Sequence, residues 1–152
     1  MAAAGGTLLK GERALANTEK HPRAEAPVAL TPEEYTAAAL AAARLREGAL
    51  LAALTRFRTK KEARQRAAGF SALYPEGRLL FFEDEAVTES GLLCRRDPYA
   101  RLAAAETPTL FVILREDGSF VPFRKDALIG CGGGDAAAFL QTAFARRLRR
   151  VR

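Results

Sequence analysis

Several residue types that usually mark a functional site are scarce in this sequence. Among 152 residues there are no tryptophans, one histidine and two cysteines. The single His21 excludes any site that needs two imidazole groups. Two thiols, Cys94 and Cys131, exclude a disulfide scaffold and an all-cysteine zinc finger. The cysteines lie far apart in the sequence, so we expect two unpaired thiols, and we expect no cofactor and no metal.

Long apolar runs are also missing. Ala37–Ala43 and Ala49–Leu54 are far shorter than the ~20 residues that cross a bilayer, so we expect no transmembrane span. No apolar run of about 7–15 residues follows a charged start, and we therefore do not expect secretion. With 49% hydrophobic and 28% charged residues, the composition is typical of one folded domain.

Positive charge exceeds negative charge in this chain. Lysine and arginine number 24 against 18 acidic residues, which gives a net charge of +6. The basic residues gather in an inner cluster and in a C-terminal tail (146–152): Arg56, Arg58, Lys60, Lys61, Arg64 and Arg66, then Arg146, Arg147, Arg149, Arg150 and Arg152. Such clusters are either solvated surface or contacts for an anionic partner, namely nucleic acid, an acidic protein or a lipid surface.

The first half of the chain divides into an arm and a regular region. Residues 1–26 have few large apolar side chains and several glycines, which predicts an extended arm. Thr31-Pro32-Glu33-Glu34 is typical of a capped helix start, and we expect that helix to reach about Arg46 and to stop at Gly48. Ala49–Leu54 predicts a buried strand, and Thr59-Lys60-Lys61-Glu62 predicts a second capped helix start.

The second half alternates short strands with turns. The expected elements are a strand Leu79–Phe82, an irregular region 83–97, a short helix Pro98–Ala105, a strong strand Thr109–Leu114, a hairpin through Gly118 to Ser119–Phe123, a glycine-rich loop 130–134 and a final helix from Asp135 to Leu148. Pro122 cannot donate a hydrogen bond to a neighbouring strand, so its strand is expected to lie at a sheet edge or to carry a bulge. This order predicts an α/β fold with a mixed central sheet and helices on both faces.

The order of these elements resembles the thioredoxin family over residues 27–148. Thr107-Pro108-Thr109, followed by an apolar strand, is similar to the cis-proline motif of that family, which makes Pro108 a candidate cis-proline. Gly118 and Gly130 match the glycines of the hairpin and of the turn after the last strand. The resemblance implies a three-layer thioredoxin-like fold.

The sequence departs from thioredoxins where their chemistry takes place. The position of the paired cysteines is held by Thr59 and Glu62, and the position of the buried acid by Ala53. Dithiol exchange needs a thiolate and a second thiol to resolve the mixed disulfide, and neither is present there. We therefore expect a redox-inactive member of the family and no enzyme.

The resemblance implies a structural role, since family members without these cysteines commonly serve in large assemblies. The leading hypothesis is a non-catalytic accessory subunit of a mitochondrial assembly, with the mitochondrial ribosome favoured by the basic tail, which would contact rRNA. The alternative is an accessory subunit of a respiratory or ATP-synthase complex. An axonemal thioredoxin-like chain and a residual redox enzyme remain further alternatives.

Overall fold

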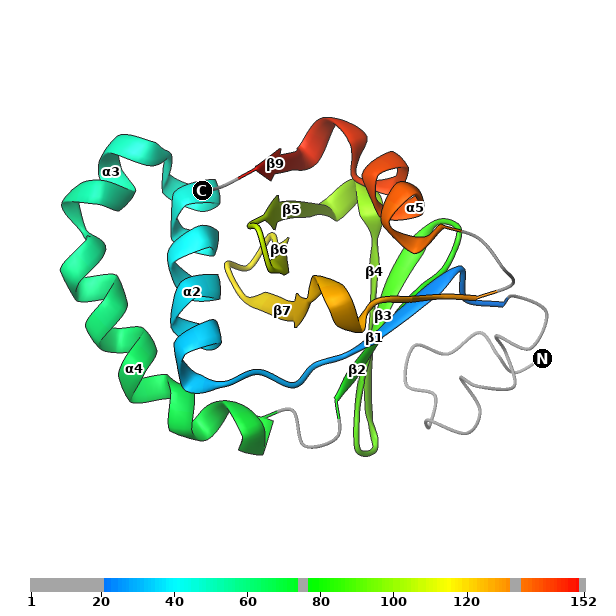
Figure 1. The fold of residues 1–152 in the computed structure, drawn as a ribbon, viewed down its shortest axis with the longest axis horizontal. Coiled ribbons are helices and arrows are strands. Elements are labelled where there is room, and N and C mark those ends of the chain that lie inside the picture. Colours follow the sequence, from blue (N-terminus) through cyan, green and yellow to red (C-terminus); the bar gives the residue numbers. More distant parts are fainter. Residues whose placement is uncertain (1–20, 74–76, 132–134, 151–152) are drawn as a thin grey trace.

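The computed structural model describes residues 21–73, 77–131 and 135–150, which form a mixed α/β domain (Figure 1). The predicted α/β class is confirmed. The helices and strands in chain order are β1 (Ala24–Pro27), α2 (Pro32–Glu47), α3 (Ala49–Leu54), α4 (Arg56–Leu73), β2 (Arg78–Phe81), β3 (Glu85–Ser90), β4 (Leu93–Pro98), β5 (Leu102–Glu106), β6 (Leu110–Arg115), β7 (Phe120–Arg124), β8 (Ile129–Gly130), α5 (Ala136–Ala143) and β9 (Leu148–Arg150).

The strands form two sheets rather than the single central sheet that the sequence suggested. One sheet has five strands in the order β4-β3-β2-β1-β8, and the other has four in the order β7-β6-β5-β9. The pairs are antiparallel except β5 with β9. Strands β1 and β2 pair antiparallel, although three helices lie between them in the sequence.

The main hydrophobic core joins the two sheets. Phe81 of β2 lies 5.6 Å from Phe123 of β7 between ring centroids, and both side chains are fully buried. Leu140 of α5 closes the same core at one end. Aromatic pairs of this kind add a contact energy of about 0.5–1.5 kcal/mol to the area that they bury. The sheets are thus fixed to one another by packing between side chains of distant segments.

Helix α2 begins and ends where the sequence predicted. Thr31 caps its first turn, and the Glu34 carboxylate accepts a hydrogen bond from the Thr31 amide at 2.9 Å, which completes the capping box. Gly48 follows its last residue with φ 88°, a conformation that glycine adopts at little cost. The helix packs its alanines against β5, β6 and β7 of the four-stranded sheet.

The expected strand Ala49–Leu54 is the helix α3, and none of its residues is buried. Alanine and leucine are strong helix formers, and the run has no β-branched residue to favour a strand. Helix α4 starts at Arg56, so the expected helix start at Thr59 is also wrong. Thr59 lies inside the helix and donates its amide to the carbonyl of Thr55 at 3.0 Å.

Two further expectations in the middle of the chain are wrong. The region 83–97 is a hairpin of β3 and β4 that turns at Gly91, whose φ is 59°. The expected helix Pro98–Ala105 is a single 3₁₀ turn, Tyr99–Arg101, followed by β5. The strand β6 and its hairpin through Gly118 are confirmed, and Pro122 lies on an edge strand as predicted.

The chain ends depart from the expected boundaries. Strand β1 begins at Ala24, so the domain starts before the end of the predicted arm, and residues 1–20 lie outside the described residues. Asp135 caps α5 as predicted, but α5 ends at Ala143 instead of Leu148. Leu148–Arg150 form β9 beside β5, and most of the glycine-rich loop (132–134) lies outside the described residues.

Two features of the thioredoxin resemblance differ in the structure, although the hairpin through Gly118 is present. The expected central strand is an exposed helix. Among the described residues no peptide bond is cis, so the prediction of a cis Pro108 is wrong. Helices α2, α3 and α4 stand together beside the sheets, and α5 lies at the far side of the domain (Figure 1).

Candidate functional site

The inner basic cluster lies on α4, directly after an exposed apolar helix. We call α3 and the first two turns of α4 the elbow (residues 49–61). Figure 1 shows the elbow at the outer end of the helical hairpin that α2 and α4 form. The structure therefore brings the predicted basic residues next to a feature that the sequence reasoning placed in the core.

The elbow presents large apolar side chains to solvent. Leu50 is 78% exposed, Leu51 49%, Leu54 75% and Phe57 90%. We call these four residues the apolar tip. Single exposed apolar residues are common on protein surfaces, but four within eight positions form a patch, and such patches mark interaction sites. The apolar tip is thus the strongest sign of binding in the described part of the chain.

A collar of positive charge adjoins the apolar tip. Arg56, Arg58, Lys60 and Lys61 lie on the first turns of α4, and between Glu47 and Glu62 the sequence has no acidic residue. Arg56, Arg58 and Lys61 are exposed, whereas Lys60 is half-buried. Neutralising partners for these four side chains are absent among the described residues, and their charges are available to an anionic surface.

Local contacts hold the elbow in place. Glu47 accepts a hydrogen bond from the Thr55 hydroxyl at 3.2 Å, and Arg46 pairs with Glu47 at 3.3 Å. The backbone is almost continuous through the bend, since the Thr55 amide donates to Leu51 and the Thr59 amide to Thr55. The exposure of the apolar tip therefore belongs to an ordered helical bend.

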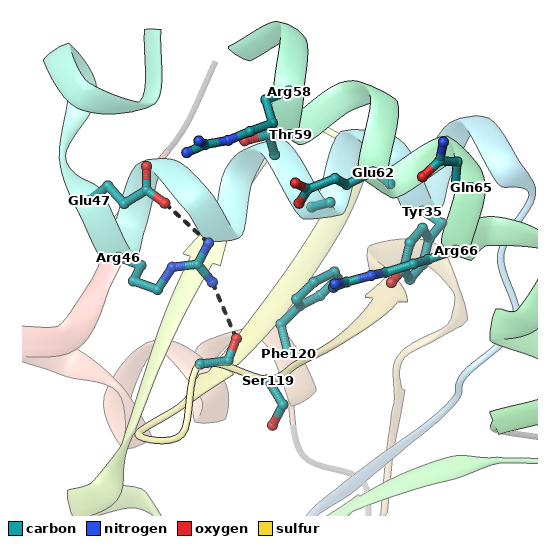
Figure 2. Close-up of a pocket in the computed structure, with 13 residues that line it drawn as sticks. Tyr35, Arg46, Glu47, Arg58, Thr59, Glu62, Gln65, Arg66, Ser119 and Phe120 are labelled. Carbon is teal, nitrogen blue, oxygen red and sulfur yellow. Dashed lines mark hydrogen bonds and ion pairs between the residues drawn. The ribbon is translucent and has the colours of Figure 1, made fainter. Parts of the chain in front are cut away.

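A cavity of about 670 Å³ lies below the elbow, between α2, α4 and the turn from β6 to β7 (Figure 2). Thr59 and Glu62, which the resemblance placed at the positions of the thioredoxin cysteines, both line this cavity. Its other lining residues come from these three segments: Tyr35, Ala39, Arg46, Glu47, Arg58, Ala63, Gln65, Arg66, Gly118, Ser119 and Phe120. The volume falls in the range of about 300–1,000 Å³ that is usual for small-molecule sites.

The charged side chains of this cavity differ in how they are held. Arg46 is fixed on one wall, because it also donates to the carbonyl of Gly118 at 3.3 Å. Arg58, Glu62 and Arg66 stand on the opposite wall at successive turns of α4. Within the described ranges these three side chains make no hydrogen bond or ion pair, although they carry opposite charges on one helix.

No protein-family model, no curated protein and no solved structure matches this chain.

The C-terminal tail is partly tied to the domain instead of extending from it. Arg147 donates to the carbonyl of Ala100, and Arg150 lies 3.7 Å from Oε1 of Glu106. Arg149 is exposed. The side chain of Arg146 and the whole of Arg152 lie outside what the structure describes. The tail and the elbow are on different elements, and Leu148–Arg150 of the tail form a short strand.

The thiols and the acidic residues give no sign of a metal or disulfide centre. Neither Cys94 nor Cys131 forms a disulfide, and both are half-buried. Nowhere in the described ranges do three or more His, Cys, Asp or Glu side chains gather closely enough to hold a metal ion. Among the same residues, no helix combines the length and apolar character that crossing a bilayer requires.

The strongly perturbed titrations belong to structural contacts away from the elbow. Hydrogen bonds from Arg124 lower the pKa of Glu34 to about 2, and hydrogen bonds from Ser119 lower the pKa of Asp117 to about 2. Burial raises the pKa of Tyr99, whose hydroxyl donates to the carbonyl of Phe82 at 2.6 Å. These groups stabilise a helix start, a turn and a sheet edge.

The apolar tip is not predicted from the sequence, because its short apolar run is also typical of a buried strand. A signal was present, since Leu50, Leu54 and Phe57 are spaced by four and three residues and share one helical face. Nothing in the sequence indicates that these side chains are exposed. The cavity was not foreseen either, because it needs the turn at Gly118 to lie against α2 and α4.

Proposed function

We propose that this chain is a non-catalytic docking module that attaches to an anionic membrane surface through its elbow. The observation that supports this most is the apolar tip at the outer end of the helical hairpin, next to the uncompensated charges of the basic collar. Interfacial helices with this composition place their apolar side chains about 5–10 Å into the headgroup region.

The expected energies favour binding that depends on both parts of the elbow. Full burial of a leucine or phenylalanine side chain contributes about 1.5–3 kcal/mol, and each Lys or Arg near an anionic leaflet contributes about 1 kcal/mol. Neither the apolar tip nor the basic collar alone is expected to offset the translational and rotational entropy that the domain loses on binding. The module would therefore prefer anionic over neutral lipid.

The test is sedimentation of the full chain with vesicles of phosphatidylcholine, with and without about 30% phosphatidylserine. We expect binding to the anionic vesicles only, and the variant Leu54→Ser with Phe57→Ser to bind at least about tenfold more weakly. Both side chains are exposed, so the fold should not change. Equal binding to both vesicle types, or unchanged binding of the variant, would contradict the proposal.

A matched control is available on another element. Leu92 and Leu93 at the turn of the β3–β4 hairpin are 88% and 73% exposed and lie far from the elbow in the sequence. The variant Leu92→Ser with Leu93→Ser removes a similar apolar area and leaves the elbow intact. We expect its vesicle binding to equal that of the unmodified chain.

A second candidate function is the accessory subunit that the sequence suggested. The specific observation in its favour is this second apolar pair, Leu92 and Leu93, since a subunit inside an assembly contacts more than one neighbour. The mitochondrial location, and the choice between a ribosome and a respiratory or ATP-synthase complex, stay predictions. Loss of co-purifying subunits in the hairpin variant, with vesicle binding absent, would favour this second function.

A further inference from the structure

The residues that line the cavity below the elbow are not the apolar residues that the proposed membrane docking uses. Leu50, Leu51, Leu54 and Phe57 do not line it, and its floor is made by segments that are distant in the sequence. Tyr35 and Ala39 come from α2, Ala63 comes from α4, and Phe120 comes from β7. Arg58 belongs both to the basic collar and to this cavity.

The floor of the cavity can accommodate an apolar group. The rings of Tyr35 and Phe120 lie 5.5 Å apart between centroids, and Ala39 and Ala63 are both buried. Alanine at both positions leaves room that larger side chains would fill, and this is why a hollow remains between two packed helices. A compact apolar or aromatic body would exclude water from these surfaces.

The walls supply positive charge that the protein does not neutralise. Arg46 is compensated by Glu47, whereas Arg58 and Arg66 make no hydrogen bond or ion pair with any described residue. Glu62 is the only unpaired acid among the described lining residues, so guanidinium charge prevails. Figure 2 shows Glu62 and Arg66 extending from α4 into the space that Tyr35 and Phe120 close from the other side.

We propose that this cavity binds a small organic anion: a carboxylate or phosphate monoester carried on a compact apolar or aromatic body. Arg66, assisted by Arg58, binds the anionic group, since guanidinium forms paired hydrogen bonds with both kinds of oxyanion. Tyr35 and Phe120 contact the body. Glu62 disfavours ligands that carry a second anionic group, which restricts the site to ligands with one such group.

The test is a titration of the full chain with 2-naphthoate, followed by the backbone amide signals in an NMR spectrum. We expect shifts at Ala39, Ala63 and Gly118, and we expect the neutral analogue 2-naphthamide to bind at least about fivefold more weakly, since it lacks the charge that Arg66 recognises. Shifts confined to residues 49–57, or equal binding of the two compounds, would overturn the proposal.

Variants on the same helix make the test specific. Arg66→Gln should weaken 2-naphthoate binding by at least about fivefold, whereas Lys61→Gln, which is exposed on α4 but does not line the cavity, should leave it unchanged. Both positions are at the surface, so equal melting temperatures are expected. An Arg66→Gln variant that binds 2-naphthoate normally would also overturn the proposal.

Two further experiments distinguish a soluble anion from a lipid headgroup as the ligand. They also distinguish this proposal from the proposed membrane docking. The variant Leu54→Ser with Phe57→Ser should retain 2-naphthoate binding, because the apolar tip lies outside the cavity. Arg66→Gln should retain binding to anionic vesicles. If Arg66→Gln instead abolishes vesicle binding and 2-naphthoate does not bind, the cavity serves a lipid headgroup and a soluble ligand is excluded.

Discussion

The Thr55 hydroxyl donates a hydrogen bond to Oε1 of Glu47 at 3.2 Å, and this contact joins the last residue of α2 to the residue that follows the exposed helix α3. The same hydroxyl lies 3.0 Å from the carbonyl of Leu51. Glu47 in turn pairs with Arg46, which reaches the turn at Gly118. The exposed elbow is therefore connected to the four-stranded sheet through a short series of polar contacts.

Replacing Thr55 by valine should loosen the elbow without unfolding the domain. The change keeps the shape of the side chain but removes its hydroxyl, and one such hydrogen bond contributes about 1 kcal/mol. Amide hydrogen exchange of residues 49–54 should become about fivefold faster, with the exchange of β6 unchanged. Thr59→Val, on the next turn, is the control and should leave exchange at 49–54 as it was. If residues 49–54 exchange at the same rate in both variants, the contact between Thr55 and Glu47 does not order the elbow.

Glu34 should make the stability of the domain depend on pH in the acidic range. Hydrogen bonds from Arg124 lower its pKa from 4.5 to about 2. A carboxylate with a lowered folded pKa stabilises the fold above its unfolded pKa, and this stabilisation is lost as the pH falls through that value towards the folded pKa. Between about pH 6 and pH 2, Glu34→Gln should therefore lose less stability than the unmodified chain.

The measurement is urea unfolding at several pH values. Glutamine can still accept the amide of Thr31, so the substitution removes the charge and keeps the helix cap. Glu33→Gln is the matched control, because Glu33 is exposed in the same turn. If both variants show the same dependence on pH, the pair of Glu34 with Arg124 does not act on stability.

Arg115 should be the charged side chain with the largest effect on stability. It extends from β6, is 6% exposed, and donates to Asp97 of β4 at 3.2 Å and to Thr88 of β3 at 3.0 Å. It therefore connects the two sheets. Arg115→Met should cost about 3 kcal/mol of unfolding free energy, because Asp97, in a largely buried position, then keeps only the more exposed Arg95 as its partner, and the Thr88 hydroxyl loses its donor.

A double-mutant cycle tests this interpretation. Arg115→Met combined with Asp97→Asn should be less destabilising than the sum of the two single changes, since the second substitution removes the carboxylate charge that the first leaves with Arg95 as its remaining partner. Urea unfolding followed by circular dichroism gives all four stabilities. A cost below about 1 kcal/mol for Arg115→Met would place this contact with ordinary surface pairs.

The predictable parts of the fold were those with redundant local signals. Helix α2 has a capping box, a proline at its first position and a terminal glycine, and β6 contains Val112 and Ile113 before a turn at Gly118. The elbow had only a short apolar run, which is compatible with a buried strand or with a helix. Its exposure depends on what the rest of the chain packs together, and this is a property of the tertiary structure.

The same limit applied to the sheets and the cavity. The acidic start at Glu83 suggested an irregular region, although Ala86, Val87 and Thr88 lie buried in β3. The pairing of β9 with β5 joins residues more than forty positions apart. The cavity forms only where three segments that are distant in the sequence meet, namely α2, α4 and the turn from β6 to β7. The basic residues could be foreseen, but the neighbours that give them a role could not.

The alanine contact between α2 and α4 has a consequence for engineering. Ala63 is buried and Ala67 partly buried, while most of the described side chains of α4 face solvent, so little of the core depends on that helix. The backbone at Gly48 and Thr55 is at the surface, and both sheets form without residues of α4. The bend should therefore accept foreign sequence, such as a tag, a reporter peptide or new chain ends in a circular permutant, while the sheets keep their register.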